Sequence, residues 1–285
     1  MTNRKTMTVV CYLLGLAVLI TFAVFYQKKE KQAEPISATA FKLNTIVTVT
    51  IYDSKNQKLA DEAVALCDKY EKLFSRTMES SELYQLNHGT LPKEGNAFVL
   101  SEETAKLIQK GLEYGKVSDG AFDIAIEPVS SLWDFTSGKK DIPSQEDISK
   151  ALPLVNYKDV QLDGNLLTFA KEGMGLDLGA IAKGYIADRI KDYLLEQGVK
   201  SATINLGGNV LCVGEKPEGT PFKIGIQKPF SDRSETIAVM NISDKSVVSS
   251  GIYERYFEKD GKIYHHILNP ATGYPYDNHL VSVTI

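Results

Sequence analysis

The sequence contains few cysteines and no excess of positive charge, and both absences exclude classes of protein. Its 285 residues carry 32 Lys and Arg against 36 Asp and Glu, a formal net charge of −4. Because a nucleic-acid-binding surface needs clustered positive charge, this balance argues against nucleic acid as a partner. The cysteines, Cys11, Cys67 and Cys212, have no metal-ligand spacing and are too few for a disulfide-dependent fold. Internal repeats and low-complexity tracts are also missing, which excludes a solenoid.

One long uncharged apolar segment is present, at residues 6–27. Its length matches the ~20 residues that cross a bilayer. No small-residue cleavage site directly follows it, so we predict that residues 1–27 form an uncleaved transmembrane anchor rather than a removed signal peptide. The signal-like layout favours a cell-membrane location with the following domain outside the cytoplasm, although basic residues flank the segment on both sides. Residues 28–39 are polar and are expected to form a tether.

Residues 40–285 mix helical and alternating patterns, which predicts one domain. Apolar residues at helical spacing indicate helices over residues 59–74 and 180–197, and Ser101 and Ser144 are candidate N-caps. Strands are predicted at residues 44–52, 201–206, 209–214, 222–227, 236–242, 245–250 and 280–285, with hairpin turns at residues 163–164 and 260–261. Strands joined by hairpins outnumber helices, so we expect an α+β fold with a largely antiparallel sheet and flanking helices.

The last strand ends the sequence abruptly. Residues 280–285, LVSVTI, alternate and stop at Ile285 without a turn, a cap or a polar tail. Because chain ends tend to be loose and exposed, we expect the sequence to be incomplete at this end.

The segment at residues 174–190, MGLDLGAIAKGYIADRI, sets a carboxylate and a lysine six residues apart around a helix start. The first amides of a helix are unpaired and attract anions. Gly179 permits close backbone approach and Lys183 falls in the first turn, an arrangement that suits a pyrophosphate. Asp177 would repel phosphate, so it would bond a ribose or base, or act through a cation. The alternative is a purely structural one, in which Asp177 caps the helix and Lys183 is solvated.

Further stretches carry candidate ligand contacts, each with an ordinary structural alternative. Phe122 could stack on a ring, and Asp123 could accept hydrogen bonds from a ring or a sugar. The glycines at residues 207–208 allow backbone to approach a flat ligand, and Arg255 is an anion partner.

Two adjacent histidines, His265 and His266, end a predicted strand. Neighbouring strand residues point to opposite faces, so they cannot share one role. One of them could act as a base or as a phosphate contact.

Together these stretches form an ordered set of motifs across the domain. The motifs are SSELYQLN (80–87), GAFD (120–123), DLGAIAKGYIAD (177–188), NLGGN (205–209), SSG-Y-R (249–255) and HHILNPATGYP (265–275). The set resembles the ApbE family of flavin transferases. This resemblance implies a Mg²⁺-dependent enzyme that moves the FMN half of FAD onto a Thr or Ser hydroxyl of an acceptor protein and releases AMP. The alternative is an exported protein that binds or hydrolyses FAD without a protein acceptor.

The resemblance also implies roles for single residues. It assigns FAD contacts to the following residues: Leu43, Tyr84, Ala121, Phe122, Asp123, Asp177, Lys183 and Leu268. It gives the backbone carbonyl of Ala180 to Mg²⁺ and makes His266 the candidate catalytic residue. The sequence departs from the family at residues 43–45, where Leu-Asn-Thr replaces the frequent Met-Gly-Thr. The family's remaining metal ligands, aspartates and a threonine, would follow residue 285.

Overall fold

The computed structural model describes residue 21, residues 34–231 and residues 235–285. The predicted anchor, residues 1–27, lies outside this part of the chain except for Thr21, and so does the first half of the predicted tether, residues 28–33. Within the described ranges, no helix has both the length and the apolar character needed to cross a membrane.

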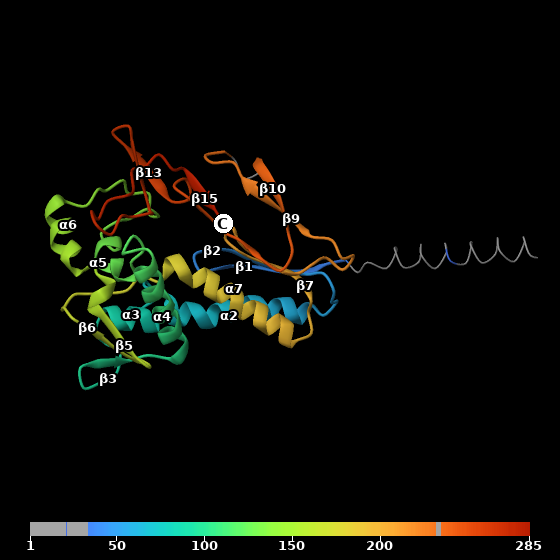
Figure 1. Ribbon diagram of the computed structural model, residues 1–285, viewed down its shortest axis with the longest axis horizontal. Helices are drawn as coiled ribbons and strands as arrows, with labels where there is room; N and C mark the ends of the chain where they lie inside the picture. Colours follow the sequence, from blue (N-terminus) through green and yellow to red (C-terminus); the bar gives the residue numbers. More distant parts are fainter. Residues whose placement is uncertain (1–20, 22–33, 232–234) are drawn as a thin grey trace, which may run out of the picture.

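A five-stranded antiparallel sheet forms the centre of the fold (Figure 1), in the order β1-β2-β7-β8-β11. Its strands are β1 (Ile36–Lys42), β2 (Thr45–Ile51), β7 (Ser201–Leu206), β8 (Asn209–Gly214) and β11 (Ser246–Val247). In β2 the alternation of Val47, Val49 and Ile51 with threonines buries one face of the strand completely. Strand β1 begins inside the expected tether, because the small and β-branched residues from Ile36 onward pair in full with β2.

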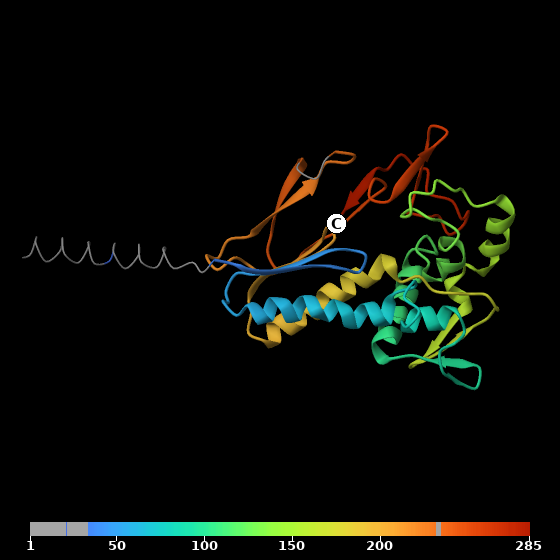
Figure 2. The same cartoon turned by 180° about the vertical axis from the view of Figure 1, so that it is seen from behind.

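Helices α2 (Gln57–Phe74) and α7 (Gly179–Glu196) lie side by side along one face of this sheet, as Figures 1 and 2 show. Their inward faces follow the helical repeat, which is why both helices bury a continuous stripe. The buried residues of α7 are Ala182, Ile186, Ala187, Ile190 and Leu194. Gly198 ends this helix with a φ of 81°, as the sequence predicts.

A second, four-stranded antiparallel sheet has the order β3-β4-β6-β5 and lies at the end of the molecule away from residue 34 (Figure 1). Its strands are β3 (Lys93–Glu94), β4 (Ala97–Val99), β5 (Val160–Asp163) and β6 (Leu166–Phe169). The helices in this half are α3 (Glu82–Asn87), α4 (Glu102–Val117), α5 (Glu127–Ser130), α6 (Gln145–Ala151) and the 3-10 turns Ile124–Ile126, Leu152–Leu154 and Tyr157–Asp159. The predicted N-caps are confirmed, since the Ser101 and Ser144 hydroxyls accept hydrogen bonds from Thr104 N and Asp147 N.

Three two-stranded units complete the C-terminal part. They are β9 (Phe222–Gln227) with β10 (Thr236–Ile242), β12 (Ser249–Gly251) with β15 (Ser282–Thr284), and β13 (Tyr256–Lys259) with β14 (Lys262–His265). Strands β9 and β10 lie across the central sheet from α2 and α7, whereas β13 lies at the end of the molecule that holds α5 and α6 (Figures 1 and 2). The predicted α+β fold with antiparallel sheets is confirmed. The strand expected at residues 245–250 divides in two, because β11 pairs with β8 whereas β12 pairs with β15.

Candidate functional site

The start of α7 is capped by Asp177. The N-cap residue, Leu178, offers no side-chain acceptor, and Asp177 Oδ1 instead accepts a hydrogen bond of 2.9 Å from Gly179 N. Asp177 N donates to Ile124 O at 2.8 Å, which fixes the segment before the helix. The structural alternative for Asp177 is therefore realised, and its contact with a ligand stays a prediction.

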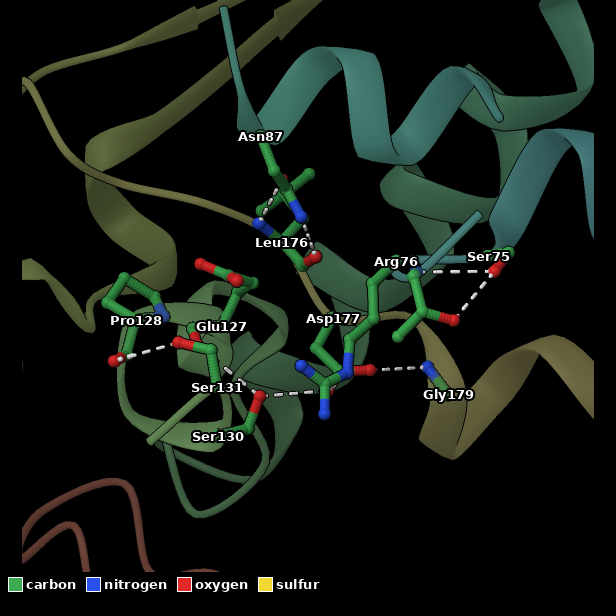
Figure 3. Close-up of polar contacts among 11 residues, drawn as sticks. Ser75, Arg76, Asn87, Glu127, Pro128, Ser130, Ser131, Leu176, Asp177 and Gly179 are labelled. Carbon is green, nitrogen blue, oxygen red and sulfur yellow. Dashed lines mark hydrogen bonds and ion pairs between the residues drawn. The ribbon is translucent and has the colours of Figure 1, made fainter. Parts of the chain in front are cut away.

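The other carboxylate oxygen of Asp177 binds two side chains (Figure 3). Ser130 Oγ donates to Asp177 Oδ2 at 2.9 Å, and Arg76 Nε lies 3.3 Å from the same oxygen. The arginine places a positive charge directly beside the carboxylate. A carboxylate near a diphosphate would be repulsive, and Arg76 offsets that repulsion.

Asn87, at the end of α3, joins the Asp177 segment to the rest of the site. Its Oδ1 accepts from Leu176 N at 2.8 Å and its Nδ2 donates to Leu176 O at 2.9 Å. Sequence reasoning missed Arg76, Ser130 and Asn87 as members of the site. The available signal was that Asn87 closes the motif at residues 80–87 and that Arg76 lies two residues after the predicted helix at residues 59–74.

Lys183, Arg255 and His266 form a group of basic side chains drawn from α7, the loop before β13 and the end of β14. Desolvation lowers the pKa of Lys183, and the Arg255 charge lowers it further, against a smaller opposing effect of Glu254. Desolvation by the surrounding atoms lowers the pKa of His266 to about 4, and Arg255, His265 and Lys183 add to this effect. The Arg255 charge thus disfavours protonation of both Lys183 and His266, and a bound anion would favour the protonated form of Lys183.

The turn between β1 and β2 is next to this basic group. Arg255 Nη2 donates to Asn44 O at 3.5 Å. Leu43 and Asn44 have φ values of 54° and 55°, in the left-handed region that favours glycine and, next, asparagine. Asn44 therefore suits the conformation that this turn requires.

The turn between β7 and β8 meets the β1–β2 turn. Gly207 N donates to Ile46 O at 3.0 Å, and a Cβ at Gly207 would overlap the side chain of Thr45. The NLGGN motif therefore lets two turns of the central sheet approach each other closely.

The predicted contacts at residues 84 and 121–123 occupy different environments. Tyr84 stacks on His88, with ring centroids 3.8 Å apart. Phe122 is half-buried against the main core and Ala121 is exposed. Asp123 is buried, and its two oxygens accept from Ala125 N and Tyr157 N at 2.7 and 2.8 Å. Burial raises the pKa of Asp123, whereas these two hydrogen bonds lower it.

The loop after β14 is held from both sides. His265 Nδ1 accepts from Ile267 N at 3.3 Å, which leaves Nε2 to donate to Tyr276 O at 3.0 Å. Leu268 forms an isolated bridge with Pro275. It packs against the buried cluster around Trp133, whose Nε1 donates to Gly273 O. His265 thus has a structural role, and His266 is left as the histidine that faces the basic group.

The same part of the chain does not supply a complete metal site. Ala180 lies exposed in the first turn of α7. Among residues 34–231 and 235–285, no three His, Cys, Asp or Glu side chains are grouped to hold a metal ion. One backbone carbonyl is insufficient for Mg²⁺, which takes six oxygen ligands.

Comparison with known proteins gives concordant matches. Residues 43–285 match the ApbE family. An FAD:protein FMN transferase of Klebsiella pneumoniae is 40% identical over 251 residues, covering 87% of this chain and 76% of the relative. One of Vibrio cholerae is 29% identical and covers 96% and 82%.

Solved structures agree with these sequence matches. The ApbE protein of Thermotoga maritima superposes with a TM-score of 0.79 at 34% identity, over 88% of this chain and 81% of that one. The flavin transferase ApbE of Vibrio cholerae gives a TM-score of 0.77 at 25% identity, with the same coverage.

Proposed function

Because this chain belongs to the ApbE family and is an FAD:protein FMN transferase, we propose that it binds FAD where α7 begins and transfers FMN to a Thr or Ser hydroxyl of an acceptor protein. The observation that carries this placement is the grouping of Lys183 from α7 with Arg255 and His266, whose Nδ1 lies 3.3 Å from Arg255 O. A diphosphate is the part of FAD that such a group would bind, since it supplies the missing negative charge.

The reaction exchanges one phosphorus–oxygen bond for another. The acceptor hydroxyl oxygen attacks the phosphorus on the FMN side of the diphosphate, and a phosphodiester forms. The anhydride bond breaks, and AMP leaves with the bridging oxygen. The proton of the hydroxyl must pass to a base or to solvent. Positioning and charge stabilisation provide most of the acceleration in such transfers.

In this proposal His266 takes the role of base. Its low pKa keeps the ring neutral at pH 7. Nδ1 lies 3.3 Å from Arg255 O and donates to it, which leaves Nε2 as a proton acceptor. In the proposal, Nε2 receives the hydroxyl proton while Lys183 and Arg255 stabilise charge on the phosphate oxygens.

The remaining contacts would hold the two ends of FAD. Asp177, with its charge offset by Arg76, accepts hydrogen bonds from a ribose or from the base. Tyr84 and Phe122 offer aromatic faces, and Leu268 offers an apolar contact.

Magnesium remains a prediction that rests on the family resemblance. In that prediction Ala180 gives one carbonyl ligand, and the described residues do not complete the site. Calorimetric titration with MgCl₂, with and without FAD, tests the prediction, and we expect binding only when FAD phosphates add ligands.

We also propose that residues 1–27 anchor the protein in the cell membrane and that the catalytic domain lies outside the cytoplasm. The support is the uncharged segment at residues 6–27. In fractionated cells the full chain should resist alkaline extraction from membranes, and external protease should cleave the domain in spheroplasts. Release by alkali, or protection from the protease, would contradict this placement.

The proposed activity is tested by following both halves of FAD. Incubation of the full chain with FAD, MgCl₂ and cell proteins should release AMP and leave flavin fluorescence on a protein band after denaturing electrophoresis. Free FMN with AMP would indicate a hydrolase, and intact FAD would indicate a binding module. Lys183→Ala should lower AMP release, whereas Lys191→Ala, on the same helix, should not.

A further inference from the structure

We propose that Arg76 is a positioning residue for Asp177: it offsets the carboxylate charge and, with Ser130, fixes the orientation in which Asp177 receives FAD. This inference rests on the proposed FAD site. It assigns a role to a residue that lies outside the motifs carrying the family resemblance.

Both oxygens of the Asp177 carboxylate have partners. Oδ1 accepts a hydrogen bond from Gly179 N, and Oδ2 accepts one from Ser130 Oγ and forms the ion pair with Arg76 Nε (Figure 3). A carboxylate offers about four lone-pair positions, and the two hydrogen bonds use two of them, so acceptor capacity is left for a ligand. The Asp177 side chain keeps 21% of its surface exposed, which provides the access.

The turn that follows α2 is fixed by hydrogen bonds and supports Arg76. Directly after α2, Ser75 Oγ accepts from Thr77 N at 3.3 Å and from Met78 N at 3.1 Å, and Ser81 Oγ donates to Ser75 O. This turn directs the Arg76 side chain toward Asp177, as Figure 3 shows. A long side chain that is only 33% exposed and held at its base loses less entropy when it forms an ion pair.

A second carboxylate, that of Glu127, lies near Asp177 and Arg76. Burial raises the pKa of Glu127, Arg76 lowers it and Asp177 raises it, so the two carboxylates and the arginine interact. A Cβ on Gly175 would lie 2.6 Å from Glu127 Oε2, so glycine is what lets Glu127 approach the segment before Asp177. Arg76 forms an ion pair with Asp177, and its charge also stabilises the ionised form of Glu127. Without it, two negative charges would face an incoming diphosphate.

The experiment measures FAD binding by quenching of the fluorescence of Trp133, the single tryptophan, and transfer by AMP release. Arg76→Ala should raise the Kd for FAD about tenfold, the change expected when one partly buried ion pair no longer fixes and offsets the carboxylate. Arg76→Lys should retain part of the affinity, and millimolar guanidinium should restore binding to Arg76→Ala. Lys72→Ala, which removes the same charge one turn earlier on an exposed side chain, is the matched control and should bind as the wild type does.

A double-mutant cycle separates positioning from folding. If Arg76 acts through Asp177, its replacement should change the Kd much less in an Asp177→Asn background than in the wild type. Equal changes in both backgrounds would overturn the proposal. So would an Arg76→Ala protein that melts at a lower temperature but binds FAD as tightly as the wild type. Failure of the wild type to bind FAD or release AMP would instead refute the proposed function.

Discussion

Asn87 and Leu176 are joined by two hydrogen bonds, one in each direction between the side-chain amide and the backbone peptide groups. The amide thus acts as a short strand partner for the segment that leads into α7. Through it, α3 with Tyr84 is tied to Asp177, so the contact unites two motifs that are distant in the sequence.

Replacing Asn87 by Ala should therefore affect both stability and binding. The loss leaves two partly buried backbone groups without partners, so we expect about 1–3 kcal/mol of destabilisation. FAD affinity should also fall, because the Asp177 segment is no longer fixed. Urea denaturation and fluorescence titration measure the two effects. Asn165→Ala, which removes a single bond to Leu100 O far from the site, is the control and should leave FAD affinity unchanged.

The affinity for FAD should depend on the charge of Lys183. Desolvation lowers the pKa of this ammonium below its usual value of 10.5. As pH rises, deprotonation removes a phosphate partner, so binding should begin to weaken at a pH below 10.5. Lys183→Arg should bind FAD up to a more alkaline pH, because guanidinium stays protonated. Identical pH profiles for the two proteins would exclude Lys183 as the titrating group.

The imidazole of His266 should titrate far below an ordinary histidine. Its pKa of about 4 in the folded protein lies under the usual 6.5. The unfolded chain therefore binds the extra proton more readily, and stability should be lost as pH falls from about 6.5 toward 4. In His266→Gln this contribution should disappear, which reduces the acid sensitivity of the melting temperature. Titration of the ring protons by nuclear magnetic resonance measures the pKa of His266 directly. A midpoint near pH 6.5 would contradict the lowered pKa.

The turn glycines offer a test of close packing. Gly207→Ala should destabilise the protein by about 1–3 kcal/mol, since it adds a steric clash to a positive φ. The clash is with Thr45 in the neighbouring turn. Gly208→Ala has a positive φ but no atom within 4 Å of the new Cβ, so it should cost less. Chemical denaturation compares the two variants, and equal losses would mean that the contact with Thr45 has no energetic role.

Local features of the fold were predictable because they depend on neighbouring residues. The caps at Ser101 and Ser144 and the stop at Gly198 follow from hydrogen bonds and backbone angles within one turn. The division of residues 245–250 into two strands was not predictable in this way, because it depends on two different partner strands.

The candidate site was likewise predictable from the sequence only where it depends on neighbouring residues. The start of α7 was visible in the spacing of Asp177 and Lys183. The partners of Asp177, which are Arg76 and Ser130, come from distant segments and have no distinctive local pattern. Long-range ion pairs of this kind require the tertiary structure, since no periodicity or capping rule relates their positions.

The decisive measurement is mass spectrometry of cell proteins from a strain that lacks this enzyme, after incubation with the purified full chain, FAD and MgCl₂. We predict a Thr or Ser residue that gains the mass of one FMN less one water, with an equal amount of AMP. The modification should be absent with Lys183→Ala. AMP without any modified residue, or FAD that stays intact, would contradict transfer at this site.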